Sequence, residues 1–206
     1  MTDFSLIASV TLIHLLAVIS PGPDFFMAIK NSLTYSRKTG IYTAIGFGLG
    51  IAVHIFYSLA GLALLISKSI VVFNIIKYLG IAYLLYLGFK SLISSSSDIK
   101  IENQIHIKDI SPLKAISQGF LTNVLNPKAT LFFLSLFTLV ISPETANTTL
   151  FIISFILIFN TALWFSLVAI FLTQKHMRVI YNRYQKYFNK LFGGVLIALG
   201  LKIAFD

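Results

Sequence analysis

Apolar residues fill six long runs of the chain, with short polar connections between them. Each run is close to or longer than the roughly 20 residues that a helix needs to cross about 30 Å of hydrocarbon. The pattern therefore predicts an all-α, polytopic membrane protein, in which residues 1–206 form one domain with six transmembrane helices. The predicted spans cover about residues 4–29, 41–66, 70–92, 115–141, 148–172 and 187–205.

Proline interrupts the first and the fourth predicted span, and each interruption carries a charge. The first reads Ser-Pro-Gly-Pro-Asp over residues 20–24, and the second reads Asn-Val-Leu-Asn-Pro-Lys over residues 123–128. Proline removes a backbone donor and clashes with the preceding turn. In lipid, the carbonyls that lose their partners must be satisfied by protein or by a wet cavity. Since ionisable residues within membrane segments mark functional sites by default, Asp24 and Lys128 lead the site candidates.

The order of elements suggests that the two halves are related. Each half begins with a proline-broken span, and its last span ends near a Gly-x-Lys sequence, at 88–90 and at 200–202. A repeat of three spans inverts its second copy, and inverted repeats with broken helices in matching positions are typical of transporters. We expect an inverted 3+3 repeat with broken helices 1 and 4. Repeat 1 would cover about 1–93, a polar cytoplasmic linker about 94–111, and repeat 2 about 112–206. Chance matches in Leu- and Gly-rich helices are the alternative.

Composition and charge agree with a membrane location. Hydrophobic residues make up 57% of the chain and charged residues 11%, whereas about a quarter of a soluble domain is charged. The absence of cysteine excludes disulfides, thiolate metal sites and thiol redox chemistry. Connections 1–2, 3–4 and 5–6 hold 12 Lys and Arg residues, against 3 in the termini and the other connections. The positive-inside rule places these three connections in the cytoplasm and both termini outside. Topology thus explains the net charge of +9 better than nucleic-acid binding does.

The first interruption suggests an anion site. Pro21 and Pro23 each deprive the carbonyl four residues earlier of its donor, and we expect Gly22 to let the chain bend between them. A helix that restarts near Asp24 would direct its first amides into the bundle, where they could bind the carboxylate of an amino acid. Asp24 could instead cap those amides or bind a substrate ammonium. The alternative is a kink for packing, with Asp24 as its N-cap.

The second interruption brings amide groups and a lysine together. Pro127 frees the carbonyl of Asn123, and the side chains of Asn123 and Asn126 supply donors and acceptors. Lysine so deep in a span costs on the order of several kcal/mol unless it pairs, snorkels or faces water. We hypothesise that Asp24 and Lys128 form a pair or share a hydrated pocket between spans one and four. Snorkelling of Lys128 to the outer surface is the alternative.

Other polar residues within the spans are weaker candidates. His54 lies in mid-span and could relay protons, because histidine titrates near neutrality; hydrogen-bonded packing is the alternative. Three glycines just before it favour close approach of another helix, with the broken first span as a candidate. Asn160 and Trp164 share a helical face and are candidates to line a cavity. His14 and Gln118 lie nearer span ends, where we expect them at the interface.

Two sequence signatures carry a family resemblance. Residues 20–24, followed by Arg37, Gly40 and glycines at 46, 48 and 50, resemble the N-terminal signature of the lysine-exporter (LysE/RhtB) family. The run Gly-Phe-Leu-Thr-Asn-Val-Leu-Asn-Pro-Lys-Ala-Thr-Leu-Phe-Phe over residues 119–133 looks like its second signature. The resemblance covers nearly the whole chain in order and length. One departure is the end of span four, where many members have Pro-x-Phe and this chain reads Phe-Thr-Leu-Val.

The resemblance implies export of small amino acids or close derivatives across the bacterial inner membrane, driven by the proton motive force. The expected partners are the amino acid, protons and the lipid bilayer, with no cofactor; a homodimer is one candidate assembly. Efflux of another small solute or a metal cation is an alternative, although the spans offer few soft metal ligands. A membrane-embedded enzyme is a further alternative. The spans hold no paired carboxylates, His-x-x-x-His spacing or activated serine, so we expect no catalytic site and no metal site.

Overall fold

A computed structural model of the protein describes residues 3–68, 70–94, 108–142 and 144–205. The described residues form helices joined by turns and short loops, without strands, as the sequence predicts. The helices are α1 (Asp3–Ile19), α2 (Pro23–Thr34), α3 (Arg37–Lys68), α4 (Ile70–Ile93), α5 (Pro112–Val124), α6 (Pro127–Val140), α7 (Asn147–Phe171) and α8 (Lys175–Phe205).

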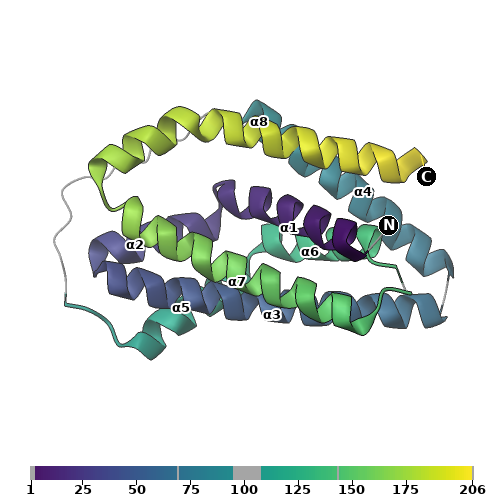
Figure 1. The fold of residues 1–206 in the computed structure, drawn as a ribbon, viewed down its shortest axis with the longest axis horizontal. Helices are drawn as coiled ribbons and strands as arrows, with labels where there is room; N and C mark the ends of the chain where they lie inside the picture. The colour runs from purple at the N-terminus through teal and green to yellow at the C-terminus, as the bar shows by residue number, and fades with distance from the viewer. Residues whose placement is uncertain (1–2, 69, 95–107, 143, 206) are drawn as a thin grey trace.

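The two halves show the same order of helices, a broken pair followed by two long helices. The first pair, α1 and α2, is bent by 56°, and the second pair, α5 and α6, is bent by 59°. In Figure 1, α3 runs from left to right and α7 runs back, while α8 likewise runs opposite to α4. These directions are those of an inverted repeat in which the first and the fourth span are broken, that is, the pairs α1–α2 and α5–α6. Most of the predicted linker, residues 95–107, lies outside the described residues.

Several of these helices are able to cross a membrane. By length and composition, α3, α7 and α8 could each span, and each bent pair could form one further span, which gives up to five. The remaining predicted span, the third along the chain, corresponds to α4, whose 24 residues extend over about 36 Å. The last predicted span began at residue 187, whereas α8 begins at Lys175. Residues 175–186, which are rich in Lys and Arg and which we assigned to a connection, form the first turns of α8.

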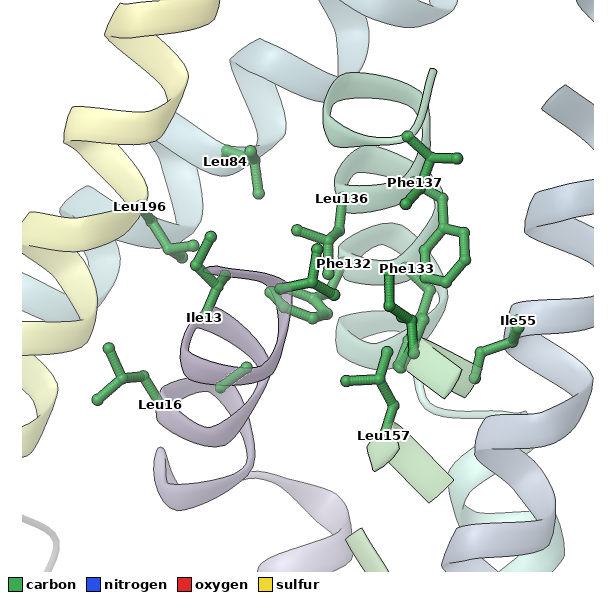
Figure 2. Close-up of a cluster of buried hydrophobic side chains, with 14 of the residues drawn as sticks. Ile13, Leu16, Ile55, Leu84, Phe132, Phe133, Leu136, Phe137, Leu157 and Leu196 are labelled. Carbon is green, nitrogen blue, oxygen red and sulfur yellow. The ribbon is translucent and has the colours of Figure 1, made fainter. Parts of the chain in front are cut away.

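Two clusters of apolar side chains hold the bundle together. The larger cluster takes residues from both halves, and Figure 2 shows Ile13 of α1 beside Leu196 of α8, and Leu136 of α6 near Leu84 of α4. The smaller cluster joins α2, α3, α7 and α8 around Phe25. In lipid such contacts stabilise mainly by close packing, because lipid tails are as apolar as leucine. The clusters thereby fix the positions of both broken helices.

Glycines allow the closest helix contact, between α3 and α5. A Cβ atom on Gly46 would collide with the backbone at Ile116, and a Cβ atom on Gly119 would collide with the backbone of Thr43. Gly48 faces α7 instead. The expected close approach is confirmed, but the neighbours are α5 and α7 rather than the broken first span. The first half of the second broken span is thus held tightly against α3.

Candidate functional site

The two interruptions meet inside the bundle and line a common cavity, which we call the inner cavity. Gly22 and Asp24 come from the first interruption, and Asn123, Asn126 and Lys128 come from the second. Its volume of about 40 Å³ leaves room for about three water molecules at 10–15 Å³ each. The remaining walls are mostly apolar: His14, Ala17, Val18, Ser20, Phe25, Ile51, Ala129, Phe132, Phe133, Thr161 and Phe165.

The carbonyls at the end of α1 are satisfied by side chains of the second half. The amine of Lys128 donates to the carbonyl oxygens of Ser20 at 2.9 Å and Ala17 at 3.3 Å. The hydroxyl of Tyr181 donates to the carbonyl of Ile19 at 3.3 Å. A cation is favourable here, because a helix C-terminus carries partial negative charge. Lys128 therefore points into the bundle, and it caps the broken helix.

The freed carbonyl of the second interruption also has partners. Pro127 removes the usual donor to Asn123, and the ring nitrogen Nε2 of His54 lies 2.9 Å from that carbonyl oxygen. The backbone amide of Asn126 donates to the same oxygen at 2.9 Å. The side-chain oxygen of Asn126 accepts from the amide of Lys128 at 3.0 Å and so caps α6. This break is closed partly by its own residues.

The hydrogen bonds of His54 define its neutral tautomer. The side chain is fully buried, with 0% of its surface exposed. A carbonyl oxygen only accepts, so Nε2 must carry the proton that it donates to Asn123. The hydroxyl of Tyr57 then donates to the other nitrogen, Nδ1. The ring also stacks on Phe133, with a centroid distance of 5.7 Å. His54 is thus packed and hydrogen-bonded. Asn123 connects it to Asp24, because the carbonyl of Asn123 binds His54 and its side-chain amide binds Asp24.

Asp24 is buried, with 8% of its surface exposed. Its Oδ2 oxygen accepts a hydrogen bond of 2.8 Å from the side-chain amide of Asn123. Gly50 makes room for this amide, since a Cβ atom there would lie 2.8 Å from Cβ of Asn123. The other carboxyl oxygen of Asp24, Oδ1, has no partner among the described residues. Asp24 and Lys128 line the same cavity, yet the described structure contains no ion pair between them.

The bend at the first interruption does not need a glycine. Gly22 has φ −165° and ψ −172°, an extended conformation that any residue adopts. A Cβ atom at this position would lie 3.4 Å from Cδ of Lys128, which is ordinary contact. Our expectation that glycine lets the chain bend is therefore wrong. Pro21 and Pro23 are sufficient to end one helix and begin the next.

Of the two polar residues that we expected at the interface, His14 is inside the bundle, whereas Gln118 is half-buried. His14 is 1% exposed and lines the inner cavity, with Nε2 3.3 Å from the hydroxyl of Thr161 and Nδ1 without a partner among the described residues. Gln118 accepts a hydrogen bond of 3.0 Å from the side chain of Asn31. Helical spacing could have indicated His14, because it shares a face with Ala17, just before the interruption.

The face of α7 that lines the inner cavity is not the predicted one. Thr161 and Phe165 contribute to the walls, whereas Asn160 and Trp164 line neither this cavity nor the larger one described below. One residue along a helix turns the side chain by about 100°. The two residues that line the cavity are four positions apart, as the predicted pair is, but each lies one position later along the helix.

A larger cavity, which we call the vestibule, lies on the other side of Lys128. Its volume is about 500 Å³, within the range of about 300–1,000 Å³ that small-molecule sites occupy. Lys128 and Asn126 line both cavities, and so do Ser20 and Gly22. Lys128 therefore forms part of the wall between them. The vestibule is further lined by Pro21, Pro23, Phe26, Tyr83, Tyr86, Leu87, Lys90, Ser91, Ser94, Pro127, Leu131 and Asn189.

Two inverted halves around a charged cavity define a membrane protein of the transporter class. Residues 15–206 match the model of the LysE type translocator family, and the chain belongs to this family. The predicted family resemblance is thus confirmed.

Individual relatives align along nearly the whole chain. The uncharacterised membrane protein YrhP of Bacillus subtilis (strain 168) is 32% identical over 205 residues, which cover 96% of this chain and 97% of that protein. The threonine efflux protein of Escherichia coli (strain K12) is 28% identical over 199 residues, with coverages of 96% and 97%. The leucine efflux protein of Enterobacter sp. (strain 638) is 37% identical over 132 residues, with coverages of 64% and 61%. No solved structure matches the chain.

Proposed function

We propose that this protein exports amino acids or close derivatives across the bacterial inner membrane by alternating access, driven by the proton motive force. Membership of a translocator family supports transport rather than catalysis. The relatives named for threonine and leucine efflux support an amino acid as the substrate class. The charge distribution of the basic residues supports an orientation with both termini outside.

The observation that carries this proposal is the set of unpaired polar atoms around the inner cavity. Oδ1 of Asp24, Oδ1 of Asn123 and Nδ1 of His14 are buried and have no partner among the described residues. A buried polar group without a partner costs about 1–3 kcal/mol, so this set favours a ligand or water that completes it. The ammonium of an amino acid brings three donors. The amine of Lys128, in the same wall, is suited to the carboxylate.

Alternating access would follow from the position of Lys128 between two cavities. The inner cavity, at about 40 Å³, is too small for an amino acid in this conformation, whereas the vestibule has room for one. The vestibule includes Lys90 and Ser91 at the end of α4, which the positive-inside rule assigns to the cytoplasmic side. A substrate carboxylate arriving there would compete with the α1 carbonyls for Lys128. Release of Lys128 from α1 would open the inner cavity.

Asp24 is the group through which protons would drive export. Its carboxylate would hold the substrate ammonium until the site faces outside, where a proton would neutralise it and release the ammonium. The proton would then return to the cytoplasm with the empty carrier. His54 is connected to Asp24 through Asn123, whose carbonyl and side-chain amide bind the two residues. This connection makes His54 the candidate for a second proton-carrying group.

The proposal is tested by export assays with Asp24→Asn, which keeps the size and removes the charge. Everted membrane vesicles with an imposed pH gradient would be given labelled threonine, leucine, glutamate or lysine. Wild type should accumulate at least one of them, and Asp24→Asn should lose gradient-driven accumulation. Asp109→Asn is the matched control, because the described partners of Asp109 are Ser36 and Thr39, away from both cavities. Equal accumulation by wild type and Asp24→Asn would contradict the role of Asp24.

A further inference from the structure

The charges of the vestibule all have one sign. Its described lining contains two lysines, Lys90 and Lys128, and neither aspartate nor glutamate. Asp24 belongs to the inner cavity and lies on the other side of Lys128. Charges of one sign in a cleft with low-dielectric walls focus the potential and raise the local concentration of the opposite charge. The vestibule is therefore a concave surface that favours anions.

Lys90 is placed to act on an arriving solute. Its side chain is exposed, and its amine lies 5.7 Å from the centre of the Tyr86 ring. The described structure holds no carboxylate within ion-pairing distance of this amine. The charge is consequently not neutralised within the described part of the chain. Lys128, by contrast, is only partly exposed, borders the inner cavity as well, and binds the carbonyls of Ala17 and Ser20. Because Lys90 is exposed and Lys128 also borders the inner cavity, we call these two positions the rim and the floor of the vestibule.

A buried acceptor lies in the same cavity. Asn189 of α8 is 2% exposed and lines the vestibule, and its Oδ1 oxygen has no partner among the described residues. A buried amide oxygen of this kind requires a donor from water or from a ligand. The ammonium of an amino acid is such a donor. The vestibule thus combines cations for a carboxylate with an acceptor for an ammonium.

We propose that the vestibule is an entry site that binds the substrate carboxylate first, through Lys90 at the rim and Lys128 at the floor, and excludes solutes with net positive charge. Asn189 accepts the substrate ammonium while the inner cavity is still closed. This inference rests on the proposed export of amino acids and specifies its substrate class. Neutral and acidic amino acids enter, whereas lysine and arginine are repelled by the two like charges.

The test is a change of charge preference in everted vesicles. Wild type and Lys90→Glu would be given the same four labelled amino acids: threonine, leucine, glutamate and lysine. We expect wild type to transport neutral or acidic amino acids in preference to lysine. Lys90→Glu should shift the transport ratio towards lysine by about tenfold, because it reverses a charge in the lining of the vestibule. Lys90→Arg, which keeps the charge, should retain the wild-type ratio.

Lys114→Glu provides the matched control. Lys114 is exposed and belongs to the same predicted cytoplasmic connection as Lys90, but it does not line the vestibule. Its reversal should leave the ratio unchanged. Transport of lysine by wild type as fast as threonine, or an equal effect of Lys90→Glu on all substrates, would overturn the entry-site proposal and leave amino-acid export intact. If wild type moved none of the four, the proposed export of amino acids would fail instead.

Discussion

Both helix interruptions leave backbone carbonyls without their helical donors, and different groups bind these carbonyls at the two places. At the first, the free carbonyls of α1 are bound by side chains that come from the other half of the chain, Lys128 and Tyr181. At the second, the free carbonyl is bound by His54 from the other half and also by the amide of Asn126 nearby. Asn126 further caps α6. The second interruption is thus partly self-sufficient, whereas the first depends on the opposite half.

This difference indicates which interruption is able to change. A cap that comes from the other half holds only while the two halves keep their relative position. The lysine that provides it also forms the wall between the vestibule and the inner cavity. Movement of one half against the other, as the proposed alternating access would require, would therefore open the first interruption before the second.

The largest effect is expected from Lys128→Met. This change removes the ammonium that binds the carbonyls of Ala17 and Ser20 at the end of α1, and it also removes the proposed partner of the substrate carboxylate. A hydrogen bond to a charged group contributes about 1.5–3 kcal/mol, so apparent substrate affinity should fall about 10- to 100-fold. Transport kinetics in everted vesicles would measure this. Lys114→Met, at an exposed lysine of α5, is the control and should behave as wild type. Unchanged affinity in Lys128→Met would remove this residue from the site.

A smaller effect is expected at the second interruption from His54→Leu. The carbonyl of Asn123 would lose the ring nitrogen but keep the amide of Asn126. We expect a loss of about 1–2 kcal/mol in the free energy of unfolding, because the acceptor remains partly satisfied. Chemical denaturation in detergent would measure it, and His54→Gln should recover part of the loss. A loss of more than about 3 kcal/mol in the free energy of unfolding would mean that the amide of Asn126 does not satisfy this carbonyl and that the second interruption is not self-sufficient.

Asn126→Ala should have a comparable, slightly smaller effect on stability. It removes the side-chain oxygen that caps α6, while the backbone amide of residue 126 still binds Asn123. Loss of such a cap costs about 1 kcal/mol. The same denaturation experiment would show it, and Asn126→Asp should restore the cap. A loss of several kcal/mol would mean that the side chain supports more than this helix end.

Tyr181→Phe should have the smallest effect. It removes one hydrogen bond of 3.3 Å to Ile19 and keeps the stacking of the ring on Phe25 at 4.9 Å. We expect a loss of about 0.5–1.5 kcal/mol in unfolding free energy, with transport retained. Tyr181→Leu, which also removes the stacked ring, should cost more. Loss of transport in the phenylalanine variant would show that the hydroxyl has a role beyond capping.

Much of the architecture could be predicted from the sequence. The apolar runs predicted the membrane helices, and proline predicted both interruptions with their charged residues, because both signals are local. The free carbonyl of Asn123 was predicted as well. Its partner His54 was recognised only as a polar residue in mid-span, since the contact joins residues 69 positions apart. The pairing of such groups depends on how helices pack, which local pattern does not define.

The parts that were missed share this long-range character. Tyr181 received no role, because its segment was assigned to a connection; the helix that carries it brings the hydroxyl to α1 across 162 positions. His14 was expected at the interface, because we judged its depth by distance from the span end and did not use the helical face that it shares with Ala17. The bend of the first span placed it beside the inner cavity. For the cavity-lining face of α7, we predicted Asn160 and Trp164, whereas the next residue in each case lines the inner cavity. The sequence of a uniformly apolar helix does not show which face points inward, because its neighbours determine that orientation.

Export by the proposed route requires a water-filled cavity where the two interruptions meet. The chain has no cysteine, so a single cysteine at Ser20, which lines both cavities, can be probed with a membrane-impermeant thiol reagent. We predict labelling from the cytoplasmic side and protection by a transported amino acid. A cysteine at Phe159, which is 54% exposed in the middle of α7, should stay unlabelled. Absence of labelling at residue 20 from both sides of the membrane would contradict the account.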